Sequence, residues 1–168
     1  MLETLCFLLG IACCYDYRSG RIPNFLVLIM FVMGWGCDAV TAGSWGMISF
    51  LIGCVGVMLL LYPLYKIGAL GAGDVKLYGV CAGYFPKDKV LLFLFLSLLI
   101  AAIISVMKMI KESNAIERIS YLCEYLLGVL QSGNFRLYIE NEKERKTSGI
   151  CLTGPIFCSV LLYLGGVY

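Results

Sequence analysis

Long apolar stretches separated by short polar ones dominate the pattern along this chain. A helix needs about 20 predominantly apolar residues to cross the hydrocarbon core of a bilayer. The pattern therefore predicts about six transmembrane helices, although the fourth apolar run is short and needs the adjoining GAGDVK segment to complete it. The expected helices cover 2–15, 23–41, 44–65, 74–86, 89–109 and 148–167.

One long polar segment, 112–146, interrupts this pattern before the last apolar run. Its apolar residues recur at helical spacing and its charged residues occupy other angles, which is typical of an amphipathic helix lying at a membrane interface. The charge run 141–146 then anchors the last span on the cytoplasmic side. The segment is either a passive interfacial helix or a cover for a functional site, or else a contact for a partner.

The composition supports a membrane protein. Hydrophobic residues make up 61% of the chain and charged residues 14%, whereas a soluble domain has about 45–50% and about 25%. The expected fold is an all-α, polytopic membrane protein with a single domain over 1–168, together with the cytoplasmic interfacial segment. No basic residue precedes the first apolar run, so we interpret it as a retained span and not as a cleaved signal peptide.

The basic residues predict the orientation. With the N-terminus outside, the loops on the outer side hold only Lys87 and Lys89. Cytoplasmic loops carry an excess of Lys and Arg, which supports this orientation. The inner side holds all the others: Arg18, Arg21, Lys66, Lys76, Lys108, Lys111, Arg118, Arg136, Lys143, Arg145 and Lys146. The protein is therefore expected in the cytoplasmic (inner) membrane as a multi-pass protein.

Two aspartates lie near the cytoplasmic face in this topology. Asp16 follows the first apolar run, and Asp74 lies between two later ones. A carboxylate at membrane depth costs about 2.5–3.5 kcal/mol on insertion scales, so such residues are usually functional. Asp38 and Asp88 fall on the other side and are interpreted as solvated loop residues.

The absence of histidine narrows the possible chemistry. Serine and cysteine proteases usually need a histidine base, and H-E-x-x-H zinc proteases need two histidine ligands. The nine cysteines form no C-x-x-C pair and are interpreted as small hydrophobic residues within helices. We expect no metal, no cofactor and no nucleic-acid partner.

Once histidine-dependent and zinc-dependent proteases are excluded, a pair of carboxylates is the remaining means of hydrolysis. Two neighbouring aspartates share one proton, because both cannot easily ionise. The ionised member takes a proton from water and the protonated member donates a hydrogen bond to the scissile carbonyl, as in the established pattern of aspartic proteases. The pair titrates as a unit, so neither role is assigned to Asp16 or to Asp74.

Each residue around the two aspartates has both a functional and a purely structural interpretation. Gly71 and Gly73 leave the backbone open to a substrate strand and allow positive φ, or they simply form a turn before a helix that Asp74 opens as N-cap. Lys76 either lowers the pKa of the pair or is a topology charge.

The residues after Asp16 have similar alternatives. Arg18 either supports the site or anchors the topology. Pro23 and Asn24 form a loop leading into the second helix, with Pro23 near its first position.

Together these motifs resemble those of the type IV prepilin peptidases, which are aspartic peptidases. Members of that family carry a first aspartate followed by a basic residue and I-P-N, and a second aspartate in G-x-G-D-x-K. The corresponding residues here are Asp16, Arg18, Ile22, Pro23, Asn24, Gly71, Gly73, Asp74 and Lys76. The resemblance covers residues 1–110, and GPIF at 154–157 is only loosely similar to the family's last helix.

The resemblance implies a six-helix membrane fold that cleaves class III signal peptides of prepilins or pseudopilins at the cytoplasmic face. It implies Asp16 and Asp74 as the catalytic pair. Its substrate would have a short basic leader, a glycine before the cut and an apolar helix embedded in the lipid bilayer after it. The chain lacks the cysteine-rich region of the larger members that also N-methylate their products. It is thus similar to the short, peptidase-only form of tight-adherence (Flp-type) pilus systems. Presenilin-like peptidases share only the outline of the motifs.

Two other hypotheses remain open at this stage. Intramembrane aspartates also occur in small proton-coupled transporters and could serve in a pilus-assembly subunit. A degenerate, non-catalytic assembly protein is a further alternative, against which the retention of both aspartates argues. The pattern does not set an oligomeric state or distinguish prepilins from preflagellins.

Overall fold

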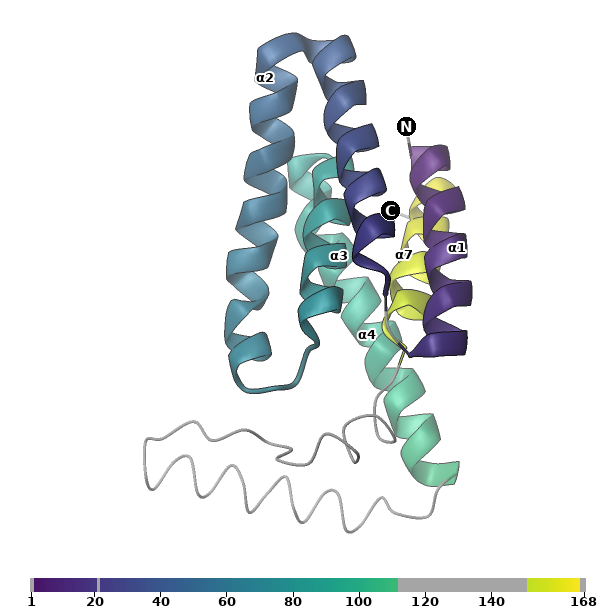
Figure 1. Cartoon of the computed structure of the whole chain (residues 1–168). Coiled ribbons are helices and arrows are strands. Elements are labelled where there is room, and N and C mark those ends of the chain that lie inside the picture. Colours follow the sequence, from purple (N-terminus) through teal and green to yellow (C-terminus); the bar gives the residue numbers. More distant parts are fainter. Residues whose placement is uncertain (1, 21, 112–150, 167–168) are drawn as a thin grey trace, which may run out of the picture.

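The computed structural model describes residues 2–20, 22–111 and 151–166, and every regular element in these ranges is a helix. This confirms the predicted all-α fold. The predicted interfacial segment 112–146 lies outside the described residues. In chain order the helices are α1 (Leu2–Ser19), α2 (Asn24–Lys66), α3 (Ala72–Tyr84), α4 (Lys87–Lys111) and α7 (Thr153–Leu164) (Figure 1).

Helix α2 is folded back on itself at Gly43. The backbone there has φ +63° and ψ −147°, a region that is essentially restricted to glycine. The 43 residues of α2 therefore form two antiparallel arms joined at one end of the molecule (Figure 1). These arms correspond to the second and third helices that the sequence predicts. Each of the six predicted helical segments therefore has a counterpart among the described helices, although 148–150 and 167 of the last one lie outside the described residues.

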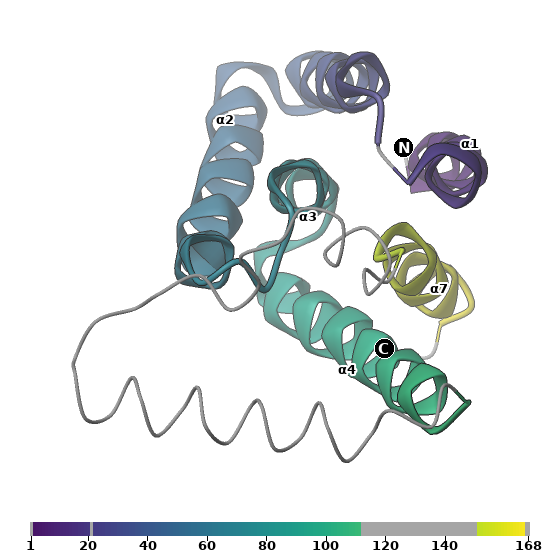
Figure 2. The same ribbon diagram turned by 60° about the horizontal axis from the view of Figure 1, so that its bottom comes forward.

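Helix α3 lies in the centre of the molecule, surrounded by α2, α4 and α7 (Figure 2). It packs most extensively against α2. Glycines make this close packing possible, because a methyl group added to Gly79 would lie 2.6 Å from Met58, and one added to Gly83 would lie 2.6 Å from Phe50. Small residues that let helix backbones approach are typical of helix interfaces in membranes.

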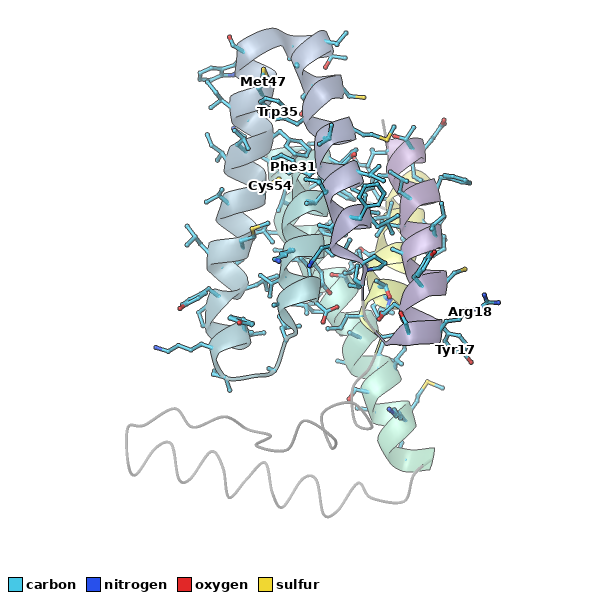
Figure 3. All side chains as sticks on the ribbon, in the orientation of Figure 1. Tyr17, Arg18, Phe31, Trp35, Met47 and Cys54 are labelled. Carbon is cyan, nitrogen blue, oxygen red and sulfur yellow. The ribbon has the colours of Figure 1, made fainter. Side chains whose placement is uncertain are left out.

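Aromatic side chains complete the contact between α2 and α3. Phe50 makes edge contacts with Phe31, at 5.7 Å between ring centroids, and with Tyr84, at 5.6 Å. The Tyr84 hydroxyl donates a buried hydrogen bond of 2.6 Å to the Met30 carbonyl. Figure 3 places Phe31 and the partly buried Trp35 on the first arm of α2, facing the second. This half of the molecule is consequently a tightly fitted apolar core.

Helices α1, α4 and α7 form the other half, in which α1 and α4 both pack against α7. The buried Ser159 hydroxyl of α7 donates a 3.3 Å hydrogen bond to the Phe93 carbonyl of α4. The Phe85 ring links the halves, since it stacks on Phe93 at 4.5 Å and contacts Tyr163 at 4.7 Å. Contacts of α1 with α2 and α3, and of α3 with α4, are less extensive.

The observed helix ends correct some predicted bounds. Helix α1 continues to Ser19, beyond the predicted end at 15, because a left-handed glycine and not the charged residues terminates it. Gly20 has φ +60° and its N–H donates to the Asp16 carbonyl at 2.8 Å, a common way to end a helix. Helix α3 ends one residue before the extended Phe85, whose conformation the following Pro86 favours.

Two described helices are long and apolar enough to cross a membrane, namely Asn24–Lys66 and the Lys87–Lys108 part of α4. Each arm of α2 has roughly 20 residues and rises roughly 30 Å, which matches a bilayer core. Large apolar side chains such as Ile52, Leu59, Leu91 and Phe95 are exposed on the outer surface of α2 and α4. These features are consistent with a membrane protein.

Candidate active site

Asp16 is a buried acidic residue in the last turn of α1, with 6% of its surface exposed. Its neighbours Tyr17 and Arg18 are exposed and point away from the bundle (Figure 3). The extension of α1 to Ser19 causes this placement, because helical spacing turns position 16 inward while 17 and 18 face out. A buried carboxylate needs partners, and the surroundings of Asp16 supply them.

Helix α7 provides the hydrogen-bond donor to this carboxylate. The fully buried Thr153, at the first position of α7, donates a hydrogen bond from Oγ1 to Oδ2 of Asp16. Just before the helix, the Cys151 thiol contacts the Asp16 carbonyl at 3.8 Å. Cys151 is an exposed residue, and the partial burial of its thiol, followed by the negative charge of Asp16, raises the pKa of that thiol.

Asp74 is the third residue of α3, and its carboxylate folds back over the start of that helix. The N-cap is Gly71, so the prediction that Asp74 itself caps the helix is wrong by three positions. A methyl group added to Gly71 would lie 2.8 Å from Oδ2 of Asp74. Gly71 has φ −75°, and the φ of Gly73 is not positive either. Room for the carboxylate, and not positive φ, therefore explains the glycine at position 71.

Both aspartates lie at the same end of the helix bundle. Figure 1 shows the end of α1, the beginning of α3 and the beginning of α7 at this end. The segment after α1 touches the start of α3, since a methyl group added to Gly73 would lie 3.9 Å from the Ile22 side chain. The halves of the molecule thus each contribute one acidic residue to this end.

The other predicted site residues lie on the periphery. Arg18, Lys76 and Asn24 are exposed. Pro23 is the N-cap of α2, so this helix begins at Asn24, one position after the predicted start at 23, and the Pro23 carbonyl accepts from the Leu26 N–H at 3.0 Å. These residues lie at or near the ends of helices.

Sequence reasoning missed three side chains near the aspartates. Thr153 is separated from Asp16 by 137 positions, so no local pattern signals their contact. Cys13 lies close enough to interact electrostatically with Asp16 and to contact Thr153. Tyr78, one turn after Asp74, is fully buried, and among the described residues its hydroxyl makes no hydrogen bond although Ser97 lies beside it. In the sequence, an aromatic residue at helical spacing indicates only a core position, so the pattern gives no sign that the Tyr78 hydroxyl is a polar group near Asp74.

A resident metal ion has no evident ligand set in the part of the chain that the structure describes. No group of three or more acidic or cysteine side chains there is suitably arranged to hold one. The described cysteines are free thiols, and Cys54 and Cys81 are buried in the core as predicted for small hydrophobic residues.

Comparison with known proteins defines the class. The sequence model of the type IV leader peptidase family matches residues 4–106, which include most of α1, all of α2 and α3, and both aspartates. No curated protein and no solved structure matches the chain. The protein is accordingly a peptidase, a hydrolase of the leader-peptidase kind. The chain belongs to the type IV leader peptidase family, which confirms the resemblance drawn from the two motifs.

Proposed function

We propose that this protein is a membrane-embedded aspartic endopeptidase that removes the leader peptide of type IV prepilin-like proteins at the cytoplasmic face of the membrane. Asp16 and Asp74 are the catalytic pair. The observation that carries the proposal is the presence of both aspartates, from sequence-distant helices, at one end of the bundle within the family match.

The chemistry follows from two carboxyl groups that share one proton. The ionised group takes a proton from a water molecule as it attacks the scissile carbonyl, and the protonated group donates a hydrogen bond to the carbonyl oxygen. The proton on the second group then passes to the leaving nitrogen. No histidine is needed, in agreement with its absence from the chain.

The proposed topology has six spans, with α2 contributing its two arms. The described basic residues support the orientation, because Arg18 and Lys66 lie in the last turns of their helices at the end that holds the aspartates. Lys87 begins α4 at the opposite end. This excess of positive charge supports a cytoplasmic position for the aspartates, where the basic leader of a prepilin would lie.

The decisive experiment is co-expression with a candidate pilin that has a basic leader and a glycine before the cut. The native enzyme shortens the pilin, which is seen as a gel shift and confirmed by the mass of the new N-terminus. Asp16→Asn and Asp74→Asn each abolish processing, at least about 10³-fold, because an amide cannot serve in a proton-sharing pair. Both variants remain in the membrane fraction at normal amounts.

Asp38→Asn and Asp88→Asn are the matched controls, since they change the same chemical group near the reversal at Gly43 and in the first turn of α4, away from the end that holds Asp16 and Asp74. We expect both to process the pilin normally. Full processing by either Asp16→Asn or Asp74→Asn would end the proposal. Proton-dependent flux through reconstituted protein, without peptide cleavage, would instead favour the transporter hypothesis.

A further inference from the structure

Thr153 stands out among the buried polar side chains because its hydroxyl is committed to Asp16. Thr153 is fully buried and Asp16 nearly so, and they come from helices at opposite ends of the chain. Thr153 lies in α7, beyond the segment matched by the family model. The role of α7 in the site is therefore a separate question from the motifs around the aspartates.

The acceptor of this hydrogen bond, a side-chain carboxylate of another helix, is unusual for a threonine at the start of a helix. Threonine near the start of a helix commonly caps a backbone N–H, and within a helix it bonds to a preceding carbonyl. In α7 the N-cap is Leu152 and no side chain caps the first turn. By comparison, Ser159 of the same helix donates to a backbone carbonyl, that of Phe93. Thr153 instead donates to a carboxylate.

We infer that Thr153 is a positioning residue for the proposed reaction. Its hydroxyl holds Oδ2 of Asp16, which leaves the other oxygen, Oδ1, to act on the attacking water. An oxygen that accepts a hydrogen bond from a hydroxyl is a poor place for a proton. The proton shared by the pair therefore resides on Oδ1 of Asp16 or on Asp74. The inference rests on the proposed catalytic role of Asp16.

This arrangement gives α7 a function that its sequence alone does not reveal. The α7 start is held against α1 by the Thr153 contact and by Cys151, which contacts the Asp16 carbonyl. Orientation of a reacting group is worth large factors in rate, because a misplacement of about 1 Å can cost about 100-fold. Loss of one hydroxyl from α7 should thus affect turnover more than binding of the pilin.

The test uses the purified full-length enzyme and a fluorescent prepilin peptide in lipid vesicles or mild detergent. Thr153→Val keeps the shape of the side chain and removes the donor, whereas Thr153→Ser keeps the donor. We expect Thr153→Val to lower kcat by about 10-fold to 100-fold with KM within about twofold of wild type. Thr153→Ser should restore kcat to within about threefold.

Ser159→Ala controls for the loss of any buried hydroxyl from α7. It should retain kcat even where its melting temperature falls. Thr153→Ala provides a second variant without the donor in case Thr153→Val does not fold. The inference is overturned if donor-free enzyme turns over at the wild-type rate, or if the serine variant is as slow as the valine variant. Activity in Asp16→Asn would instead refute the proposed function itself, so the two failures are distinguishable.

Discussion

The half that carries Asp74 and the half that carries Asp16 are stabilised by different means. In the half that carries Asp74, α2 and α3 fit together through glycines and aromatic rings, with the Phe50–Tyr84 contact at the end of α3 opposite Asp74. Around Asp16, α1, α4 and α7 are joined by buried hydroxyl groups, those of Thr153 and Ser159. The comparison teaches that the helix carrying Asp74 is held by steric fit, whereas the Asp16 side chain is held by a hydrogen bond, so the two halves should respond to different substitutions.

The largest expected effect tests the steric fit on stability. A methyl group at Gly34 would lie 2.6 Å from Phe50 and 2.7 Å from Tyr84, whereas Gly36 on the same arm has nothing within 4 Å. We expect Gly34→Ala to lower the free energy of unfolding by about 1–3 kcal/mol relative to Gly36→Ala. Both gain the same helix propensity, so the difference isolates the clash. Denaturant titration of the purified protein in detergent measures it.

If Gly34→Ala proved as stable as Gly36→Ala, the packing between α2 and α3 would have to be looser than described. The distinction between the two halves would then disappear. A parallel loss of the Tyr84 hydrogen bond to Met30, seen as increased exchange of nearby amides, would confirm the predicted mechanism.

The second effect concerns activity without loss of stability. Gly71→Ala is compatible with the backbone at φ −75°, but its methyl group would displace the Asp74 carboxylate. We expect processing to slow by about tenfold or more, while the unfolding free energy changes little, because a flexible side chain can turn away. Gly73→Ala, whose methyl would only touch Ile22, should lose less. A single-turnover cleavage assay compares them.

Equal losses in the two variants would contradict this explanation. They would favour the alternative that both glycines simply leave room for the substrate backbone, as the sequence motif alone predicts.

The smallest effect probes the charge of Asp16. Partial burial and the Asp16 charge raise the pKa of the exposed Cys151 thiol, so its reactive thiolate is scarce at neutral pH. Replacing Asp16 by asparagine removes the second cause and lowers that pKa toward its ordinary value. Alkylation of Cys151 at pH 8 should therefore speed up by about two- to fivefold. Mass spectrometry follows it, with the exposed Cys37 at the other end as internal reference.

An unchanged Cys151 rate in that variant would mean that burial alone governs the thiol. The Asp16 charge would then have no effect on the Cys151 thiol, although the hydrogen bond from Thr153 to Asp16 could still be present.

Much of this architecture could be predicted from apolar periodicity. All six helical segments were expected, and Asp16 and Asp74 were expected on the same side because two spans separate them. The errors occurred where local backbone chemistry decides. Gly20 ends α1 four residues later than the charges indicated, and Gly71 replaces Asp74 as N-cap. The contact of Thr153 with Asp16 is purely tertiary, and only the assembled bundle reveals it.

Gly43 determines more than the shape of one helix. As an uninterrupted rod, the 43 residues of α2 would extend about 64 Å, more than twice the thickness of a bilayer core. In the proposed topology the reversal at this single position sends the chain back across the membrane, and every later segment inherits its direction from it. One residue without a side chain, far from the chemistry, thereby decides on which side of the cell envelope the second acidic group arrives.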